Sequence, residues 1–582
     1  MRIIRFIPAV LFTALAAWAA PATPEDLLIL PQLHGRPGGR LVYAERTEPR
    51  TLNPLMATDS YSREVIQRLQ ADLIHINRAT MQPEPALAKS WKASADGLHY
   101  TLELRRGVRF SDGAPFDADD VVFTFEALLD AKVNAPQRDL LLLDGRPIVA
   151  RKLDAYTVAV DLPGPYSVPE RLFDGLWMLP RHLLEAAWRE GKLGEAWGVR
   201  TAAKDMAGLG PFRLKAYVPG QRVLLERNPY YWKEDGAGNR LPYLSELDFV
   251  NAGTEDMQVM RLESGESDAI GRVGAKNFGV LEREAGRRGY QMEDAGPGLE
   301  LSFLFFNLNE IPANASAERK ARLANFQRKN FRQAVAAAID RDALVKLVYQ
   351  GRATALASPV AGGNTRWIDA SLPRPARSVR RAKELLAADG YKWNASGALV
   401  DPQGRPVAFS ILASSSNPER TETAALLQDD LKQVGMAVEV VPLETRSLVD
   451  RVTHSFDYET ALLSMATGDA DPNPDMNTWL SSGGSHWWRP LQKTPATAWE
   501  SEIDGLMRKQ LTTRRYEDRK RMFDRVQELL MENLPLIPLV SPHILTGARR
   551  GLGNFRPAVM DHYVLWNCEE MYWSGSTPGD RQ

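Results

Sequence analysis

The stretch 88–125 constrains the fold most, because a strand, two turns and a helix start follow one another within it. Apolar and polar residues alternate through 100–104, which predicts a strand with one buried face. Asp-Gly pairs stand before it at 96–97 and after it at 112–113, and such pairs mark turns. Carboxylates within 117–120 then precede an apolar run, a pattern typical of a capped helix N-terminus.

The same stretch also resembles a known family. The matching residues are Trp91, Asp96-Gly97, Tyr100, the run Leu-Arg-Arg-Gly-Val-Arg-Phe at 104–110, Asp112-Gly113 and Asp119-Asp120-Val121. Together, and without a gap, they look like the signature of the large extracytoplasmic solute-binding proteins of peptide-type ABC transporters, solute-binding family 5. Two later blocks, 208–232 and 331–351, also resemble this family.

The resemblance implies an α/β fold with two lobes, which is the periplasmic-binding-protein fold (class II-like, type C). It also implies two crossovers between the lobes, expected near 301–307 and 535–542, and an extra subdomain in lobe one. A chain of 582 residues suits this fold, because that length exceeds what one core usually supports. The expected limits are 1–20 for a signal peptide, 21–300 for lobe one with its subdomain at about 87–197, 301–540 for lobe two, and 541–582 for the return to lobe one.

The first residues have the pattern of an export signal. Arg2 and Arg5 are followed by a short apolar core at 6–16 and by small residues at the predicted cleavage point, 19–22. The alternative is a membrane anchor, for which this core is short. Since the only cysteine is Cys568, we expect no lipid anchor and no disulfide framework. We therefore predict a free periplasmic protein.

Composition and motifs give no sign of other chemistry. The net charge of −1 provides no bulk attraction to nucleic acid or anionic lipid. None of the histidines has the spacing of a zinc site, and no Gly-x-Ser-x-Gly nucleophile motif is present. Gly208 and Gly210 are not expected to cradle phosphate, because Pro211 and a strand follow them. We expect a binding protein without cofactor or metal; a periplasmic hydrolase with a triad of distant residues stays open.

The best candidate site is the polar loop within 464–479, which follows a predicted strand. Loops at strand ends often carry ligands. In the family an aspartate after a Thr-Gly-like turn pairs with the ligand's free amino group. The matching residue here is Asp469, preceded by Thr467 and Gly468. A carboxylate suits this role because a buried ammonium needs a charged partner; a turn-capping aspartate is the alternative.

Three more residues complete the candidate site. The family often holds the ligand's carboxylate with an arginine before the helix that starts near Glu419, but this chain has Ala-Ser-Ser at 413–415. The nearest arginine is Arg420, and whether it replaces the missing one stays open. The departure favours a longer peptide or a ligand without that carboxylate. Trp487 and Tyr61 are aromatic candidates for lining the cleft, with simple packing as the alternative.

By resemblance, the protein binds a peptide or related solute between its lobes and presents it to the permease of an ABC importer. Closure about a hinge would bury the ligand. A nickel chelate, a sugar or an opine on the same scaffold is the alternative. Asp471 and Asp475 are expected to be turn residues, and the protein is expected to be a monomer.

Overall fold

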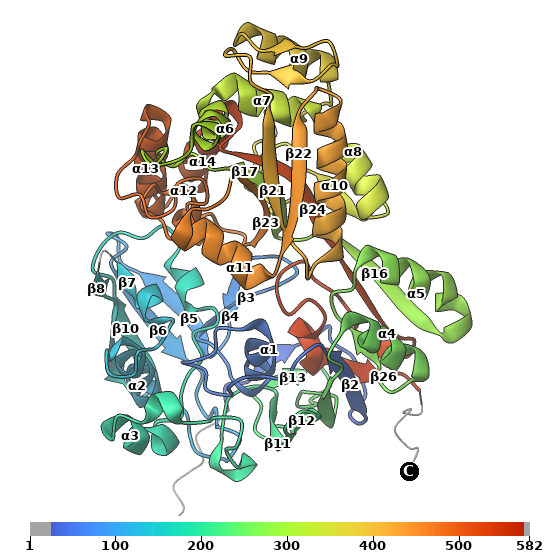
Figure 1. Ribbon diagram of the computed structural model, residues 1–582. Coiled ribbons are helices and arrows are strands. Elements are labelled where there is room, and N and C mark those ends of the chain that lie inside the picture. Colours follow the sequence, from blue (N-terminus) through green and yellow to red (C-terminus); the bar gives the residue numbers. More distant parts are fainter. Residues whose placement is uncertain (1–24, 144, 576–582) are drawn as a thin grey trace, which may run out of the picture.

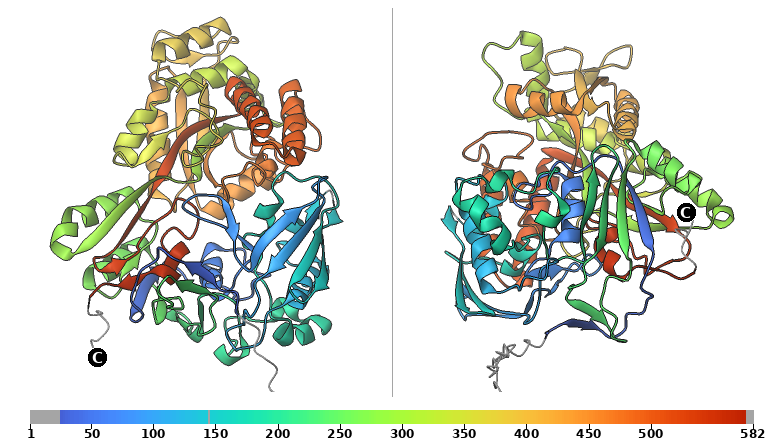
Figure 2. Two further views of the ribbon diagram at one scale, coloured as in Figure 1. Left: turned by 180° about the vertical axis from the view of Figure 1, so that it is seen from behind. Right: turned by 90° about the horizontal axis from the view of Figure 1, so that it is seen from below.

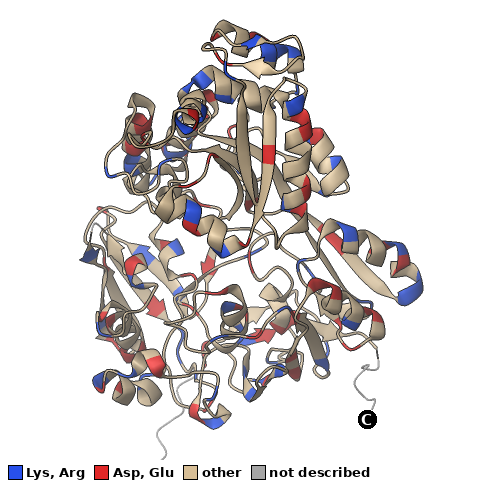
Figure 3. Ribbon diagram, in the orientation of Figure 1, with Lys and Arg blue, Asp and Glu red and all other residues tan. Residues whose placement is uncertain are grey.

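A computed structural model describes residues 25–143 and 145–575 (Figure 1). The predicted signal peptide at 1–20 lies outside these residues. Among the helices that the structure describes, none has the length and hydrophobicity needed to cross a bilayer. Acidic and basic residues are interspersed over the whole molecule (Figure 3), in keeping with the small net charge.

One mixed sheet of twelve strands runs through the whole molecule. Strand β24 (Leu536–Arg549) lies near its middle and pairs with β15, β16, β17 and β18. The sheet order is β11 (Phe212–Val218), β12 (Arg222–Arg227), β14 (Glu246–Asn251), β2 (Arg40–Glu45), β15 (Ala269–Ile270), β24, β17 (Glu300–Phe306), β23 (Thr460–Ala466), β21 (Ala408–Ser414) and β22 (Ala437–Leu443); β16 (Tyr290–Pro297) and β18 (Ala353–Ala355) lie off this path.

Two crossings connect two lobes. The first half of β24 pairs with β17, with Leu536 opposite Phe305, and its last residues pair with β15 and β16, with Gly547 opposite Ile270. Figure 2 shows β24 in red, running from one lobe into the other. The chain makes its other crossing between β16 and β17, at Gly298 and Leu299. The fold thus has the two interlobe crossovers that the resemblance implies.

Lobe one is the part that packs around the core containing Leu41, Leu102 and Phe125. It includes a four-stranded sheet of β5 (Ala88–Ala93), β6 (His99–Leu104), β10 (Thr157–Asp161) and β9 (Val149–Asp154). The predicted strand is confirmed, because alternate residues of β6 are buried. The predicted helix start is also confirmed: Asp117 caps α2 (Ala118–Leu129) with a capping box.

Lobe two is the part that packs around a second core, which contains Phe303, Phe305 and Phe306 of β17. Strand β21, helix α10 (Pro418–Lys432) and strand β22 form a strand–helix–strand unit whose two strands pair in parallel. Helices α7 (Lys329–Ala338), α13 (Ala498–Thr512) and α14 (Tyr516–Asn533) also contribute buried residues to this core. The limits of the two lobes at 300/301 and 540/541 stay a prediction.

Two local details complete lobe one. The apolar run 41–43 lies in β2, but the first strand of the structure is β1 (Leu28–Leu30), which pairs with β13 (Lys233–Asp235). A three-residue strand whose partner lies some 200 positions away leaves no clear alternation in the sequence. The segment 149–161 forms a hairpin of β9 and β10, with Val158 and Val160 in β10.

The remaining elements connect or cover these units. They are β3 (Ile74–Ile76), β4 (Pro83–Pro85), β7 (Leu142–Leu143), β8 (Arg146–Pro147), β19 (Lys392–Trp393), β20 (Leu399–Val400), β25 (Leu552–Gly553), β26 (Tyr572–Trp573), α1 (Ser60–Leu69), α3 (Arg181–Arg189), α4 (Glu255–Ser264), α5 (Ala275–Arg288), α6 (Ala317–Gln327), α8 (Arg341–Ala343), α9 (Val379–Ala388), α11 (Thr445–Asp450) and α12 (Met476–Trp479).

The crossing strand gives a first test. Ile537 lies in β24 and is fully buried, so we expect Ile537→Ala to lower the free energy of unfolding by about 2–5 kcal/mol. Urea unfolding followed by tryptophan fluorescence measures this change. The matched control is Leu347→Ala, at a side chain that is 60% exposed, for which we expect a change within about 0.5 kcal/mol. Equal effects of the two substitutions would contradict the assigned core.

Candidate ligand-binding cleft between the lobes

A cavity of about 250 Å³ lies where the lobes meet beside the crossing strands. Both lobes and both crossings contribute to its wall, so a molecule held there would touch all of them. The charged side chains are Arg46, Glu255 and Arg272 from lobe one, and Arg352, Glu419 and Arg420 from lobe two, with Glu300 of β17 and His543 of β24 at the crossings.

The wall from lobe one is neutralised by its own contacts. Arg46 Nη2 donates to Glu255 Oε2 at 2.8 Å and to the carbonyl of Arg272 at 2.8 Å. The guanidinium of Arg272 pairs with the carboxylate of Glu300. Glu255 also accepts a hydrogen bond from the backbone N–H of Gly274, the residue that precedes α5. These charges therefore hold the wall in shape and leave little for a ligand to satisfy.

The wall from lobe two differs, because Glu419 and Arg420 in the first turn of α10 have no ion-pair partner within 4 Å among residues 25–143 and 145–575. The Nε of Arg420 is buried without a hydrogen-bond partner. Burial, reinforced by the charge of Glu255, raises the pKa of Glu419. A partly buried guanidinium and carboxylate that lack ion-pair partners in a cavity wall are groups that a polar ligand can satisfy.

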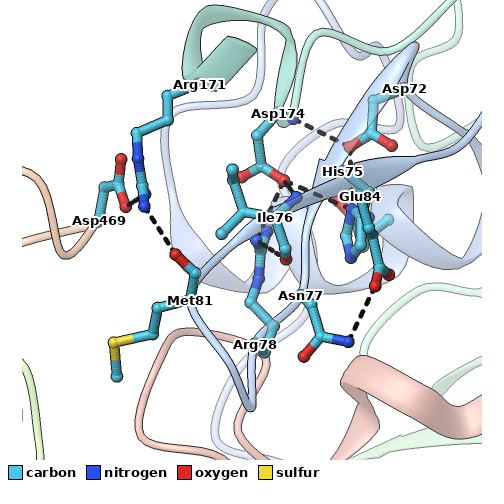
Figure 4. A network of polar contacts seen from close by, with 12 residues as sticks. Asp72, His75, Ile76, Asn77, Arg78, Met81, Glu84, Arg171, Asp174 and Asp469 are labelled. Atoms are coloured by element: carbon cyan, nitrogen blue, oxygen red, sulfur yellow. Dashed lines mark hydrogen bonds and ion pairs between the residues drawn. The ribbon is translucent and has the colours of Figure 1, made fainter. Parts of the chain in front are cut away.

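The loop after β23 carries the predicted residues Thr467, Gly468 and Asp469. The backbone N–H of Thr467 donates to the carbonyl of Leu299 at 2.9 Å, so the loop is attached to a crossing. Asp469 faces lobe one, where it accepts a hydrogen bond from Arg171 Nη1 (Figure 4). Burial raises the pKa of Asp469 to about 6, although the nearby charge of Arg171 opposes this shift.

The neighbouring aspartates have structural roles. Asp471 is a turn residue, as expected, because its Oδ1 accepts a hydrogen bond from the backbone N–H of Asn473 at 3.0 Å. It also accepts hydrogen bonds from Arg519 Nη1 at 2.8 Å and Nη2 at 2.6 Å, and both side chains are buried. This pair fastens the loop to α14. Asp475 also lies in a turn, where it precedes α12 and its carbonyl accepts hydrogen bonds from the backbone N–H groups of Thr478 and Trp479 within that helix.

The aromatic candidates do not line the interlobe cavity. The ring of Trp487 packs against Phe305, with 6.3 Å between ring centroids, and its carbonyl accepts a hydrogen bond from the Tyr458 hydroxyl. Tyr61 lies on α1 beside a small hollow within lobe one, which Phe249 also lines. Of the six predicted residues, the structure places Arg420 in the cavity wall and residues 467–469 at the lobe interface. A ligand contact for any of the six stays a prediction.

Sequence reasoning missed Arg171, Arg519 and the charged wall of lobe one. Arg171 meets Asp469 across 298 positions of sequence, and Arg519 meets Asp471 across 48. No spacing rule connects such residues. The one available signal for Arg519 was the presence of three acidic residues in the loop, which is too weak to assign a partner.

Comparisons with known proteins agree with this geometry. The model of the bacterial extracellular solute-binding proteins, family 5, matches residues 82–487. The chain belongs to this family. It is 26% identical to the peptide transport periplasmic protein SapA of Salmonella typhimurium strain LT2, over 86% of each chain. The family and this relative are binding proteins of transporters rather than enzymes, and the relative is periplasmic.

Solved structures with lower identity show the fold. The oligopeptide-binding protein AppA from Bacillus subtilis, in complex with a nonapeptide, is 22% identical with a TM-score of 0.70, over 93% of this chain and 100% of AppA. NikA from Brucella suis, in complex with Fe(III)-EDTA, is 21% identical with a TM-score of 0.76, over 92% of this chain and 100% of NikA. The protein described here thus has the expected two-lobed α/β fold.

The pair that holds the candidate loop can be tested. Asp471→Ala leaves the buried guanidinium of Arg519 without its carboxylate, and we expect the free energy of unfolding to fall by about 3–5 kcal/mol. Urea unfolding measures it. Asp342→Ala is the control, because that carboxylate is 78% exposed beside Arg374 and we expect a change within about 0.5 kcal/mol. If Asp471→Ala were as mild as the control, the loop would not depend on this pair.

Proposed function

We propose that this protein is the substrate-binding component of an ABC importer. It binds a peptide or a related small solute between its lobes and delivers it to the permease at the inner membrane. The observation that carries this proposal is the cavity walled by both lobes beside the two crossings. A ligand there contacts both lobes, so it favours the closed arrangement over the open one. The names of the relatives SapA and AppA support a peptide.

Two charged groups are proposed to contact the ligand. Arg420 is assigned to an anionic group of the ligand, because it lines the cavity and lacks an ion-pair partner among the described residues. Asp469 is assigned to an amino group, with Thr467 and Gly468 shaping the turn before it. Ser464 of the cavity wall and Thr467 belong to one short segment at the end of β23.

A compact, charged solute such as a metal chelate or an opine is the second candidate. Pockets for drug-sized ligands usually measure about 300–1,000 Å³, and the cavity of about 250 Å³ is smaller. Its wall also carries more charged side chains than apolar ones. A short ligand with several polar groups suits such a space better than a long peptide does.

The remaining parts of the proposal concern export, the limits of the lobes and the absence of enzymatic activity. The signal peptide is proposed to be cleaved near 19–22, which leaves a free periplasmic monomer. Lobe one is proposed to extend from 21 to 300 and to include 541–582, and lobe two from 301 to 540. The protein is proposed to have no enzymatic activity, in line with its family.

Native mass spectrometry of protein exported with its own signal tests this function. We expect a bound solute that is released on collisional activation and can be identified by its mass. Arg420→Gln should reduce its affinity by about 2 kcal/mol or more, roughly thirtyfold, because a buried charged contact is lost. Arg508→Gln is the control, since Arg508 is 59% exposed on α13.

Two results would count against the proposal. The first is wild-type protein that neither carries a solute nor gains one from peptide mixtures. The second is Arg420→Gln protein that retains the same solute at the same occupancy as the wild type, which would remove Arg420 from the site.

A further inference from the structure

Arg171 reaches from lobe one to the carboxylate in lobe two that is proposed to bind the ligand. It lies in a short 3-10 helix, Pro169–Phe173. Its Nη1 donates to Asp469 Oδ1, and its Nη2 donates to the carbonyl of Met81 at 2.6 Å (Figure 4). The side chains of Arg171 and Asp469 are 12% and 17% exposed. The guanidinium is thus held on both sides and shielded from water.

The surrounding residues fix Arg171 in this place. Asp174, just after the short helix, accepts hydrogen bonds from the backbone N–H of Ile76 at 2.9 Å and from Arg78 Nη1 at 3.0 Å. Met81 lies at the tip of the hairpin β3–β4 and packs near Leu299 of the crossing. The backbone on both sides of the guanidinium is therefore anchored, and little side-chain freedom remains to be lost when the ion pair forms.

The ion pair is part of a second contact between the lobes, which is made by residues outside the two crossing segments. The backbone N–H of Ser167 donates to the carbonyl of Leu511 at 2.8 Å. Asn473 Nδ2 donates to Ser167 Oγ at 3.0 Å. Residues 167–171 of lobe one are thereby joined to lobe two at three points, and the pair of Arg171 with Asp469 is the charged one.

Among the residues that the structure describes, no second cation forms an ion pair with Asp469. The nearby carboxylates are already occupied, Asp471 by Arg519 and Asp174 by Arg78. Within the part of the chain that the structure describes, Arg171 is the one ion-pair partner of Asp469. A carboxylate this well shielded needs a cationic partner to stay ionised, so either Arg171 or a cation from the ligand must take that place.

We propose that Arg171 is a specificity-determining residue, because its guanidinium occupies the position at Asp469 that a ligand's ammonium group would take. The inference rests on the proposed role of Asp469 and extends it. A ligand with a free amino group then binds only by displacing Arg171, and its apparent affinity falls in proportion to the fraction of protein in which Asp469 is free. A ligand with a blocked amino group binds without this cost.

Isothermal titration calorimetry tests this inference with two probes, tetra-alanine and N-acetyl-tetra-alanine, on protein freed of solute by unfolding and refolding. We expect Arg171→Gln to raise the affinity for tetra-alanine tenfold or more and that for the acetylated peptide less than twofold. The double variant Arg171→Gln with Asp469→Asn should lose this gain. The control is Arg189→Gln, an arginine 71% exposed on α3, which should change neither affinity.

A ratio of the two affinities that Arg171→Gln leaves unchanged would overturn the inference. So would a gain that persists in the double variant, because the effect would then not act through Asp469.

A second readout needs no ligand and separates this inference from the proposed function. Ser167 is 6% exposed at the interlobe contact, so a cysteine placed there by Ser167→Cys reacts with a thiol reagent only when the lobes separate. The native Cys568 is fully buried and should not compete for the reagent. We expect Arg171→Gln to raise the labelling rate at least threefold in this background, and Arg189→Gln to leave it unchanged. If no variant binds either peptide, the proposed peptide ligand fails, whereas an unchanged labelling rate overturns the role of Arg171.

Discussion

The hydrogen bonds of one long strand hold the architecture together. Strand β24 pairs with β17 in lobe two and with β15 and β16 in lobe one, so the backbone itself joins the two cores. The other crossing, at Gly298 and Leu299, lies beside it. Elsewhere the described contacts between the lobes are made by side chains and loops, which can separate without breaking the sheet. A cleft that opens and closes follows from this arrangement.

The charged side chains of the cleft differ in whether they already have a partner within the protein. Arg46, Arg272 and their partner carboxylates satisfy one another, whereas Arg420 and Glu419 do not find partners among the residues described. Asp469 pairs with Arg171 where the two lobes touch. In the proposed site, a ligand thus meets two kinds of group: side chains that are free, and a carboxylate that must first exchange an internal cation. Such competition separates solutes by the state of their amino group, a distinction that cavity size alone does not make.

Much of the local structure could be predicted, because its causes are local. Alternation at 100–104 gave β6 and Asp117 gave the start of α2, since burial periodicity and capping act over a few residues. The resemblance placed Asp469 in a loop at the lobe interface. The partners could not be predicted: Arg171 and Arg519 are brought to their aspartates by the tertiary fold, and so is the pairing of β1 with β13. The part of the cavity wall that lobe one contributes was missed for the same reason.

Locking the lobes together tests the central claim most directly. Ser167→Cys and Asn473→Cys, whose native side chains touch across the lobes, can be joined by a reducible methanethiosulfonate cross-linker. Native mass spectrometry then follows the solute that co-purifies with the protein during dialysis. The solute should stay bound while the cross-link is intact and leave after reduction. Release at the same rate with the lobes locked would show that the solute does not lie between them.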